Sequence, residues 1–190
     1  MLSSITPLGQ QGRGGSWTRT VVGFWTGAVL AAAAVFTVAG AMGSLIGLDR
    51  LNPWISLVAI AAAAVLDMTG VRPLGPRRQV DEDWLGRYRD WVIGFGFGAQ
   101  LGLGFVTIVP SFGYWALLVV AASVGLPQAV LIGVGFGVGR SLLLLTARRI
   151  GSPSALAEMM RRFTGAEPLA RKAAMAAYGI VILTVVLNVN

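Results

Sequence analysis

The chain has 190 residues, of which 55% are hydrophobic and 12% charged, with a formal charge of +7 and neither Cys nor His. This composition is typical of an integral membrane protein, and the missing residue types exclude thiol redox chemistry, thiolate metal sites and imidazole catalysis within the chain. We expect no cofactor and no metal site. We also expect no nucleic-acid partner, because membrane topology accounts for the positions of the basic residues.

Apolar segments follow one another along the chain after a polar N-terminal tail at residues 1–16. The sequence predicts an all-α integral membrane protein with a single transmembrane domain over residues 17–190. Its expected spans cover residues 17–47, 53–71, 89–125, 126–148 and 171–189.

The third apolar segment, from Tyr88 to Gly125, has an unusual length and contains Pro110 as its only proline. A straight membrane helix uses about 20 apolar residues, so the segment is too long for one plain span and short for two. It forms either a hairpin of two spans or one crossing that is broken at Pro110.

The distribution of Lys and Arg separates these two topologies. With a hairpin at Pro110, seven basic residues fall on each side of the membrane. With one net crossing, thirteen lie on the cytoplasmic side, only Arg50 lies outside, and Arg140 falls within a span. The positive-inside rule favours the second topology. The sequence therefore predicts five crossings of the cytoplasmic (inner) membrane, with the N-terminus inside, the C-terminus outside and a discontinuous third helix.

Polar residues cluster along this third helix, where Gln100 precedes the break and Thr107 and Ser111 flank it. Two interpretations are open for Pro110: a simple proline kink, or a functional break. Charge balance and segment length favour the break. We expect residues 108–113 to leave helical hydrogen bonding, with Gly113 supplying backbone freedom and these residues lining a substrate path.

Two charged residues lie a helical turn or more inside the ends of predicted spans, Asp67 in the second and Arg140 in the fourth. Both lie near the inner ends of their helices, and the long Arg side chain can reach down to the carboxylate. The sequence predicts an interhelical ion pair, with an anion or proton site as the alternative.

Glycines at a spacing of four residues predict close helix packing. Whether these faces serve plain packing, a moving contact or an oligomer is open. The glycines concerned are Gly94, Gly98 and Gly102 in the third helix and Gly133, Gly135, Gly137 and Gly139 in the fourth.

The last connection predicts a short amphipathic helix on the cytoplasmic side of the membrane. Ser152 suits an N-cap, Pro153 the first helical position and Gly165 a stop. Apolar residues share one face of this helix, which we expect to rest on the lipid bilayer. They are Leu156, Met159, Met160 and Phe163.

The stretch GFGFGAQLGLGFVTIVPSFGYWALLVVAAS resembles the second broken helix of the CcdA/DsbD transmembrane family, relatives of the LysE-type exporters. In that family a Pro-Cys-x-Gly-Pro break carries the reactive thiol. Here Pro110 and Gly113 match, while Ser111 stands at the Cys position and Tyr114 at the second Pro. The resemblance implies a six-helix scaffold that here lacks its first broken helix, which leaves the five crossings and the termini that the charge count predicts.

Three functions are compatible with such a Cys-less scaffold. One is a small-solute carrier or exporter whose polar path follows the broken helix. Another is a non-catalytic membrane subunit that assembles with itself, as a homo-oligomer, or with a redox or transport partner. An enzyme is the weakest of the three, because Asp67 is the only intramembrane acid and has a partner in Arg140.

Overall fold

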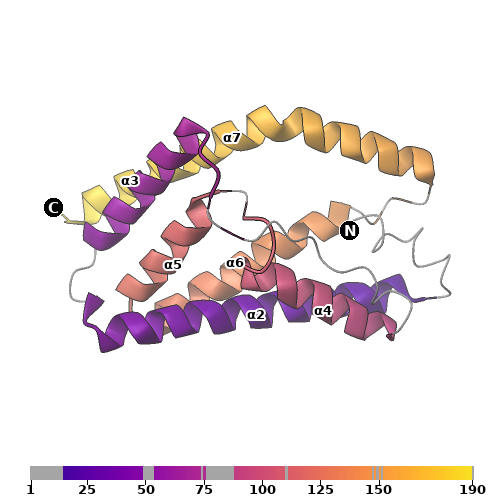
Figure 1. Cartoon of the computed structure of the whole chain (residues 1–190), viewed down its shortest axis with the longest axis horizontal. Coiled ribbons are helices and arrows are strands. Elements are labelled where there is room, and N and C mark those ends of the chain that lie inside the picture. The colour runs from indigo at the N-terminus through magenta and orange to yellow at the C-terminus, as the bar shows by residue number, and fades with distance from the viewer. Residues whose placement is uncertain are drawn as a thin grey trace. The chain divides into compact units, whose positions relative to one another are not determined.

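The computed structural model of the chain is helical wherever it has regular secondary structure, and its described residues contain no strand. It describes residues 15–48, 54–73, 75, 88–109, 111–146, 148, 150 and 152–189. Figure 1 shows the helices in chain order: α2 (Trp17–Leu45), α3 (Trp54–Thr69), α4 (Asp90–Leu103), α5 (Gly113–Ser123), α6 (Leu126–Thr146) and α7 (Pro153–Val189).

Among the described residues, α2 and α6 are long and apolar enough to cross a membrane, by length and composition alone, while α3 and α5 are shorter apolar helices. The chain divides into two compact units, and α2, α6 and α7 each contribute to both. Unit 1 comprises Met1–Ala33, Gly75–Ile108 and Gly133–Thr164; unit 2 comprises Ala34–Leu74, Val109–Ile132 and Gly165–Asn190.

In unit 1, the glycines that repeat along α4 bring its backbone against that of α2. A Cβ added at any of them would come closer than 3.0 Å to a carbonyl oxygen of α2. The pairs are Gly94 with Thr20, Gly98 with Phe24, and Gly102 with Ala28. This order shows that α4 runs parallel to its part of α2. In each of these pairs the residue numbers differ by 74. The same difference separates Ser16 and Asp90, which are joined by a hydrogen bond from the Ser16 amide to Asp90 Oδ2 at 2.7 Å.

The α2 side of this contact also depends on glycine, at Gly23 and Gly27, whose added Cβ atoms would meet the backbone of α4. Small residues on both helices allow the close backbone approach that drives helix association where no hydrophobic effect acts between helices. Larger side chains fill the space beside it and form the core of unit 1: Phe24, Ile93, Phe97, Leu144 and Ile150.

The glycines of α6 divide into a packed and an open set. A Cβ at Gly137 would lie 2.7 Å from Val29 Cα of α2, so this glycine permits a helix contact. A Cβ at Gly135 or Gly139 would meet no heavy atom of the described structure within 4 Å. Gly133 lies in the same helix. Packing among the described residues therefore explains Gly137 but not Gly135 and Gly139.

In unit 2, α3 packs against α5 in the antiparallel direction. Ser56 Oγ and Ser123 Oγ are 2.8 Å apart near one end, and Asp67 contacts Phe112 near the other. A different face of α5 contacts the C-terminal part of α2, where added Cβ atoms would meet Ala121 at Gly40 and Ala122 at Gly43. Both sequence numbers rise together in these contacts, so α5 runs parallel to its part of α2.

The third predicted span contains two helices, and the first of them ends earlier than expected. α4 stops at Leu103, and Gly104 takes φ 73° and ψ −58°. Phe105 N then donates to Leu103 O at 2.8 Å, which closes a γ-turn around Gly104. The non-helical residues therefore begin at Gly104 rather than at residue 108. Pro110 lies outside the described residues.

The predicted stop at Gly165 is wrong, because α7 continues through it as one helix of 37 residues that also contains Pro168. Gly in a helix interior costs only about 1 kcal/mol relative to Ala, which does not end a helix by itself. The predicted start is observed: α7 begins at Pro153, and Ala155 N donates to Ser152 Oγ at 3.2 Å. In its first turns, a hydrogen bond from Arg162 holds the pKa of Glu158 below its ordinary value.

The γ-turn predicts a specific cost for a side chain at Gly104. Gly104→Ala should lower the free energy of unfolding by about 1–3 kcal/mol, since a non-glycine residue is strained at this φ and ψ. Denaturant or thermal unfolding in mild detergent measures the loss. Gly135→Ala is the matched control, because its Cβ enters open space in a helix, and it should be neutral or slightly stabilising. Equal stability of both variants would contradict the turn.

Candidate functional site at the helix break

The carboxylate of Asp67, in the last turn of α3, accepts three hydrogen bonds from groups elsewhere in unit 2. Phe112 N donates to Oδ1 at 2.8 Å. Ser111 Oγ and Tyr178 OH donate to Oδ2 at 2.7 and 2.8 Å. One acidic side chain thus joins α3, the residues before α5, and α7. We refer to Asp67, Ser111 and Tyr178 as the carboxyl–hydroxyl cluster.

The position of this cluster follows from the start of α5. The first amides of a helix have no partner within the helix and carry the positive end of its dipole. Phe112, the N-cap residue, makes no side-chain cap. Its own amide is satisfied by Asp67 instead, and Gly113 N donates to Ser111 Oγ at 2.9 Å. A carboxylate from another helix therefore caps α5.

Tyr178 approaches the start of α5 so closely that only glycine fits at position 113. A Cβ on Gly113 would collide with Tyr178 OH and lie 3.0 Å from Ser111 Oγ. Gly113 is not among the glycines with positive φ, which are Gly47, Gly70 and Gly104. The predicted role of Gly113 as a source of backbone freedom is therefore wrong: it makes room for the tyrosine hydroxyl.

The C-terminus of α3 is fixed by two further features. Gly70 follows the helix with φ +74°, the conformation of a glycine C-cap. From α7, Arg171 Nη2 donates to the carbonyl oxygens of Asp67 and Met68 at 3.3 and 3.0 Å. A cation at the last carbonyls also complements the negative end of the α3 dipole. These contacts hold the turn that carries the Asp67 side chain.

The structure brings together only some of the residues predicted from the sequence. Asp67, Ser111 and Gly113 share the cluster, whereas Gln100, Thr107 and Arg140 belong to unit 1. Gln100 is half-buried on α4, and Thr107 Oγ1 donates to Gly104 O at 3.4 Å. The Arg140 guanidinium carbon lies 5.5 Å from the centre of the Phe136 ring. The ion pair of Asp67 with Arg140 stays a prediction.

Tyr178 is absent from the site predicted from the sequence, although it supplies one of the three donors to Asp67. The sequence held a signal, because Tyr178 and Thr184 are the only hydroxyl-bearing residues in the apolar run from Ala173 to Leu187. Its partners could not be found this way, since 111 residues separate it from Asp67.

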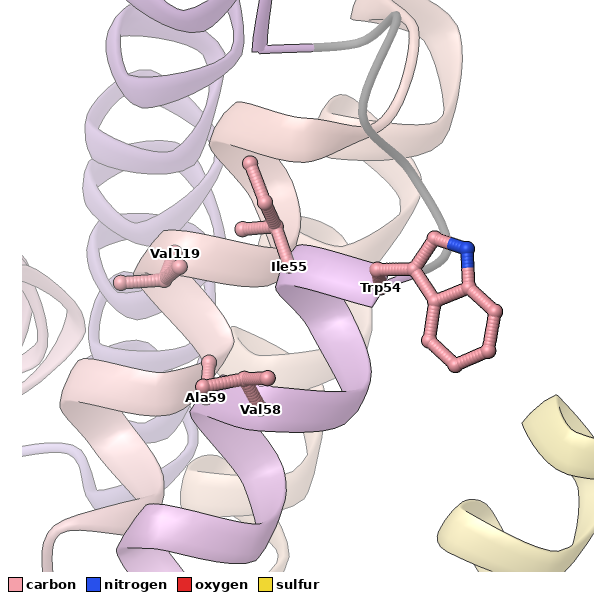
Figure 2. A pocket seen from close by; sticks show the side chains of 5 residues that line it. All are labelled: Trp54, Ile55, Val58, Ala59 and Val119. Atoms are coloured by element: carbon pink, nitrogen blue, oxygen red, sulfur yellow. The ribbon is translucent and has the colours of Figure 1, made fainter.

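Two grooves of the described structure share no lining residue with the cluster. One, of about 440 Å³, is lined only by apolar side chains of α3 and Val119 of α5, and Figure 2 shows the Trp54 ring directed away from α5. It offers no polar side chain that could orient a polar solute. The other, of about 550 Å³ in unit 1, is lined by Arg19, Arg89, Asp90 and Trp91.

The described residues contain no group of three or more acidic, His or Cys side chains that could hold a metal ion.

No protein-family model, curated protein or solved structure matches this chain. The candidate site therefore rests on its own geometry: a carboxylate, two hydroxyls and two helix-terminal amides within hydrogen-bonding distance.

The close approach of Tyr178 to Gly113 predicts coupled mutations. Gly113→Ala should displace the tyrosine hydroxyl and cost about 1–2 kcal/mol of stability, the net worth of the hydrogen bonds lost. In a Tyr178→Phe background the same change should cost less, because the colliding hydroxyl is gone. Unfolding of the four proteins in mild detergent gives the coupling energy. Gly179→Ala, whose Cβ enters open space, is the control. Strictly additive losses would contradict the contact.

Proposed function

We propose that the chain is a multi-pass membrane protein that carries a small solute, with the start of α5 as its binding region. In this proposal it crosses the cytoplasmic membrane five times and has a CcdA/DsbD-like scaffold without thiols. The observation that carries the proposal is the carboxyl–hydroxyl cluster at the start of α5, where backbone amides, hydroxyls and a carboxylate meet among otherwise apolar helices.

Membrane insertion is supported by the surfaces of the helices as well as by their length. Large apolar side chains are exposed along α2, α3 and α7, including Leu30, Val58 and Ile180, each at 61% or more. So many exposed large apolar side chains are unusual on a soluble monomer and are typical of residues that contact lipid. The two long helices α2 and α6 supply candidate spans of 29 and 21 residues.

A single net crossing of the broken helix is supported by the distribution of basic residues. With one crossing, thirteen Lys and Arg lie on the cytoplasmic side and only Arg50 lies outside, whereas a hairpin places seven on each side. The positive-inside rule favours the single crossing.

A solute site at such a break has a physical basis. Non-helical backbone at membrane depth is tolerated only where protein or a wet cavity satisfies its polar groups, and carriers use half-helix ends in this way. Here the start of α5 meets polar side chains from α3 and α7. A solute with hydrogen-bonding groups could exchange with these contacts, while the surrounding apolar side chains would exclude ions that are not recognised.

The proposed topology predicts the sidedness of introduced thiols, which are unambiguous because the chain has no Cys. In intact cells, an impermeant maleimide should label Asn190→Cys, at a position outside the described residues, and should leave Ala155→Cys unlabelled until the cells are opened. Labelling of Ala155→Cys in intact cells would contradict the single crossing and support the hairpin of two spans.

The carrier function predicts flux that can be blocked at Ser111. Proteoliposomes with purified Ser111→Cys protein, loaded with a pool of amino acids and carboxylic acids, should release at least one compound faster than protein-free liposomes, as measured by mass spectrometry. A membrane-permeant bulky maleimide should reduce this release to the protein-free level. The control is Val22→Cys, exposed on α2, whose modification should leave release unchanged. Release no faster than from protein-free liposomes would contradict the carrier.

A second candidate, a non-catalytic membrane subunit, is favoured by the open glycines of α6. Gly135 and Gly139 present a smooth face that packing among the described residues does not explain, and such faces suit a second helix. Purification in mild detergent with mass spectrometry distinguishes the two. A partner or second copy that is retained by the wild type but lost on Gly139→Leu would support the subunit function, and a monomer with flux would support the carrier.

A further inference from the structure

We propose that the groove of about 550 Å³ at the starts of α2 and α4 binds the phosphate of an anionic phospholipid through Arg19 and Arg89. The groove belongs to unit 1 and shares no residue with the proposed solute site. Its position at a lipid surface rests on the membrane insertion in the proposed function.

Two parallel helices bring the arginines into one groove. Arg19 lies in the first turn of α2, and Arg89 is the N-cap residue of α4. Contacting residues of the two helices are 74 positions apart, which places Arg19 level with residue 93, about one helical turn beyond Arg89. Arg side chains are long enough to span such a distance. One guanidinium group therefore comes from the start of each helix, and both line the same groove.

The groove has an excess of positive charge. Its described lining contains two guanidinium groups and one carboxylate, that of Asp90, which leaves one net positive charge. Asp90 Oδ2 already accepts a hydrogen bond from Ser16 N at 2.7 Å. Among the residues that the structure describes, neither Arg19 nor Arg89 has a hydrogen-bond or ion-pair partner for its side chain. Both cationic groups are therefore available to an anion.

A phosphodiester matches these groups in charge and in hydrogen bonding. It carries one negative charge, and its two unesterified oxygens accept the paired hydrogen bonds that a planar guanidinium group donates. The groove is also large enough, since small-ligand sites have volumes of about 300–1,000 Å³. A phosphodiester bound by both arginines would hold the starts of α2 and α4 together.

Exposed aromatic side chains favour a lipid over a soluble phosphate compound. Trp91 is 54% exposed, and Phe95, four residues further on the same face of α4, is 39% exposed. Indole rings are enriched at the membrane–water interface, and the acyl chains of a lipid would cover the apolar surface beyond the groove.

The charge of the groove selects an anionic lipid. In the proposed topology α2 starts at the cytoplasmic leaflet, where basic pockets between helices bind anionic headgroups. A zwitterionic phospholipid fits less well, because the net positive charge of the groove repels its ammonium group.

Native mass spectrometry of the purified full-length chain in mild detergent tests the site by titration with phosphatidylglycerol. Arg19→Gln and Arg89→Gln should each weaken binding of the first lipid about tenfold, because a charged hydrogen-bonding partner of the phosphate is lost. Arg19→Lys and Arg89→Lys should weaken it less, since lysine keeps the charge but not the paired hydrogen bonds. The control is Arg72→Gln, an exposed arginine that does not line the groove, and it should bind like the wild type.

Two further ligands identify the source of the phosphate. Phosphatidylethanolamine with the same acyl chains should bind about fivefold more weakly than phosphatidylglycerol. Inorganic phosphate and glycerol 3-phosphate, at the concentration of the lipid, should not displace it. Displacement by either would identify a soluble phosphate compound as the ligand and overturn the lipid site.

The inference is also wrong if both glutamine variants bind like Arg72→Gln, or if the two lipids bind equally. Gel filtration establishes folding, and the lysine variants replace any glutamine variant that does not fold. Phosphatidylglycerol binding without solute flux would count against the carrier alone. Flux without selective lipid binding would count against this site alone.

Discussion

The contact between Asp67 and the Phe112 amide at the start of α5 is the interaction on which the architecture of unit 2 depends. A helix that begins inside an apolar protein exposes backbone N–H groups, and each such group left without a partner in hydrocarbon costs several kcal/mol. Phe112 has no side chain that can cap the helix, so the carboxylate arrives from α3. Because that carboxylate must reach the start of α5, α3 is held antiparallel along α5, and the hydroxyl of α7 is drawn to the same point.

Glycine provides the complementary constraint, since it sets how closely the remaining helices approach. Along α2, each contact with α4 places a glycine of one helix against a carbonyl of the other, an arrangement in which any side chain would collide. In the proposed membrane location the helices would lack a hydrophobic driving force for association, and such backbone contacts would supply much of the packing energy. The glycine that ends α4, Gly104, acts differently: its positive φ permits the γ-turn that releases the chain from the helix. Close approach and backbone freedom are thus assigned to different glycines.

These constraints together give the proposed function its chemistry. In the proposed CcdA/DsbD-like scaffold, Ser111 occupies the position of a reactive thiol, and in this chain it donates to a carboxylate and accepts from the amide of Gly113. A hydroxyl in that place cannot transfer electrons, but it can exchange hydrogen bonds with a neighbour. With Tyr178 and Asp67 it forms the group of hydrogen-bonding side chains that the proposed carrier would use to contact a solute.

Composition and hydropathy by themselves determined the helical class, the approximate lengths of α2 and α6, and the presence of a break in the third apolar segment, because these follow from local hydropathy and from segment length. The extent of α7 was not predicted, since it joins the expected short helix and the last span. The N-cap at Ser152 was also predictable, because it depends only on neighbouring residues of the chain. Gly165 failed as a stop, because a single glycine costs too little to end a helix whose flanks continue on both sides. Only the tertiary structure decided which groups satisfy the break. Asp67 and Tyr178 are 111 residues apart, and their meeting at Ser111 depends on how three helices pack, which no local pattern contains. The role of Gly113 was hidden for the same reason: the atom that excludes a side chain there belongs to a distant tyrosine.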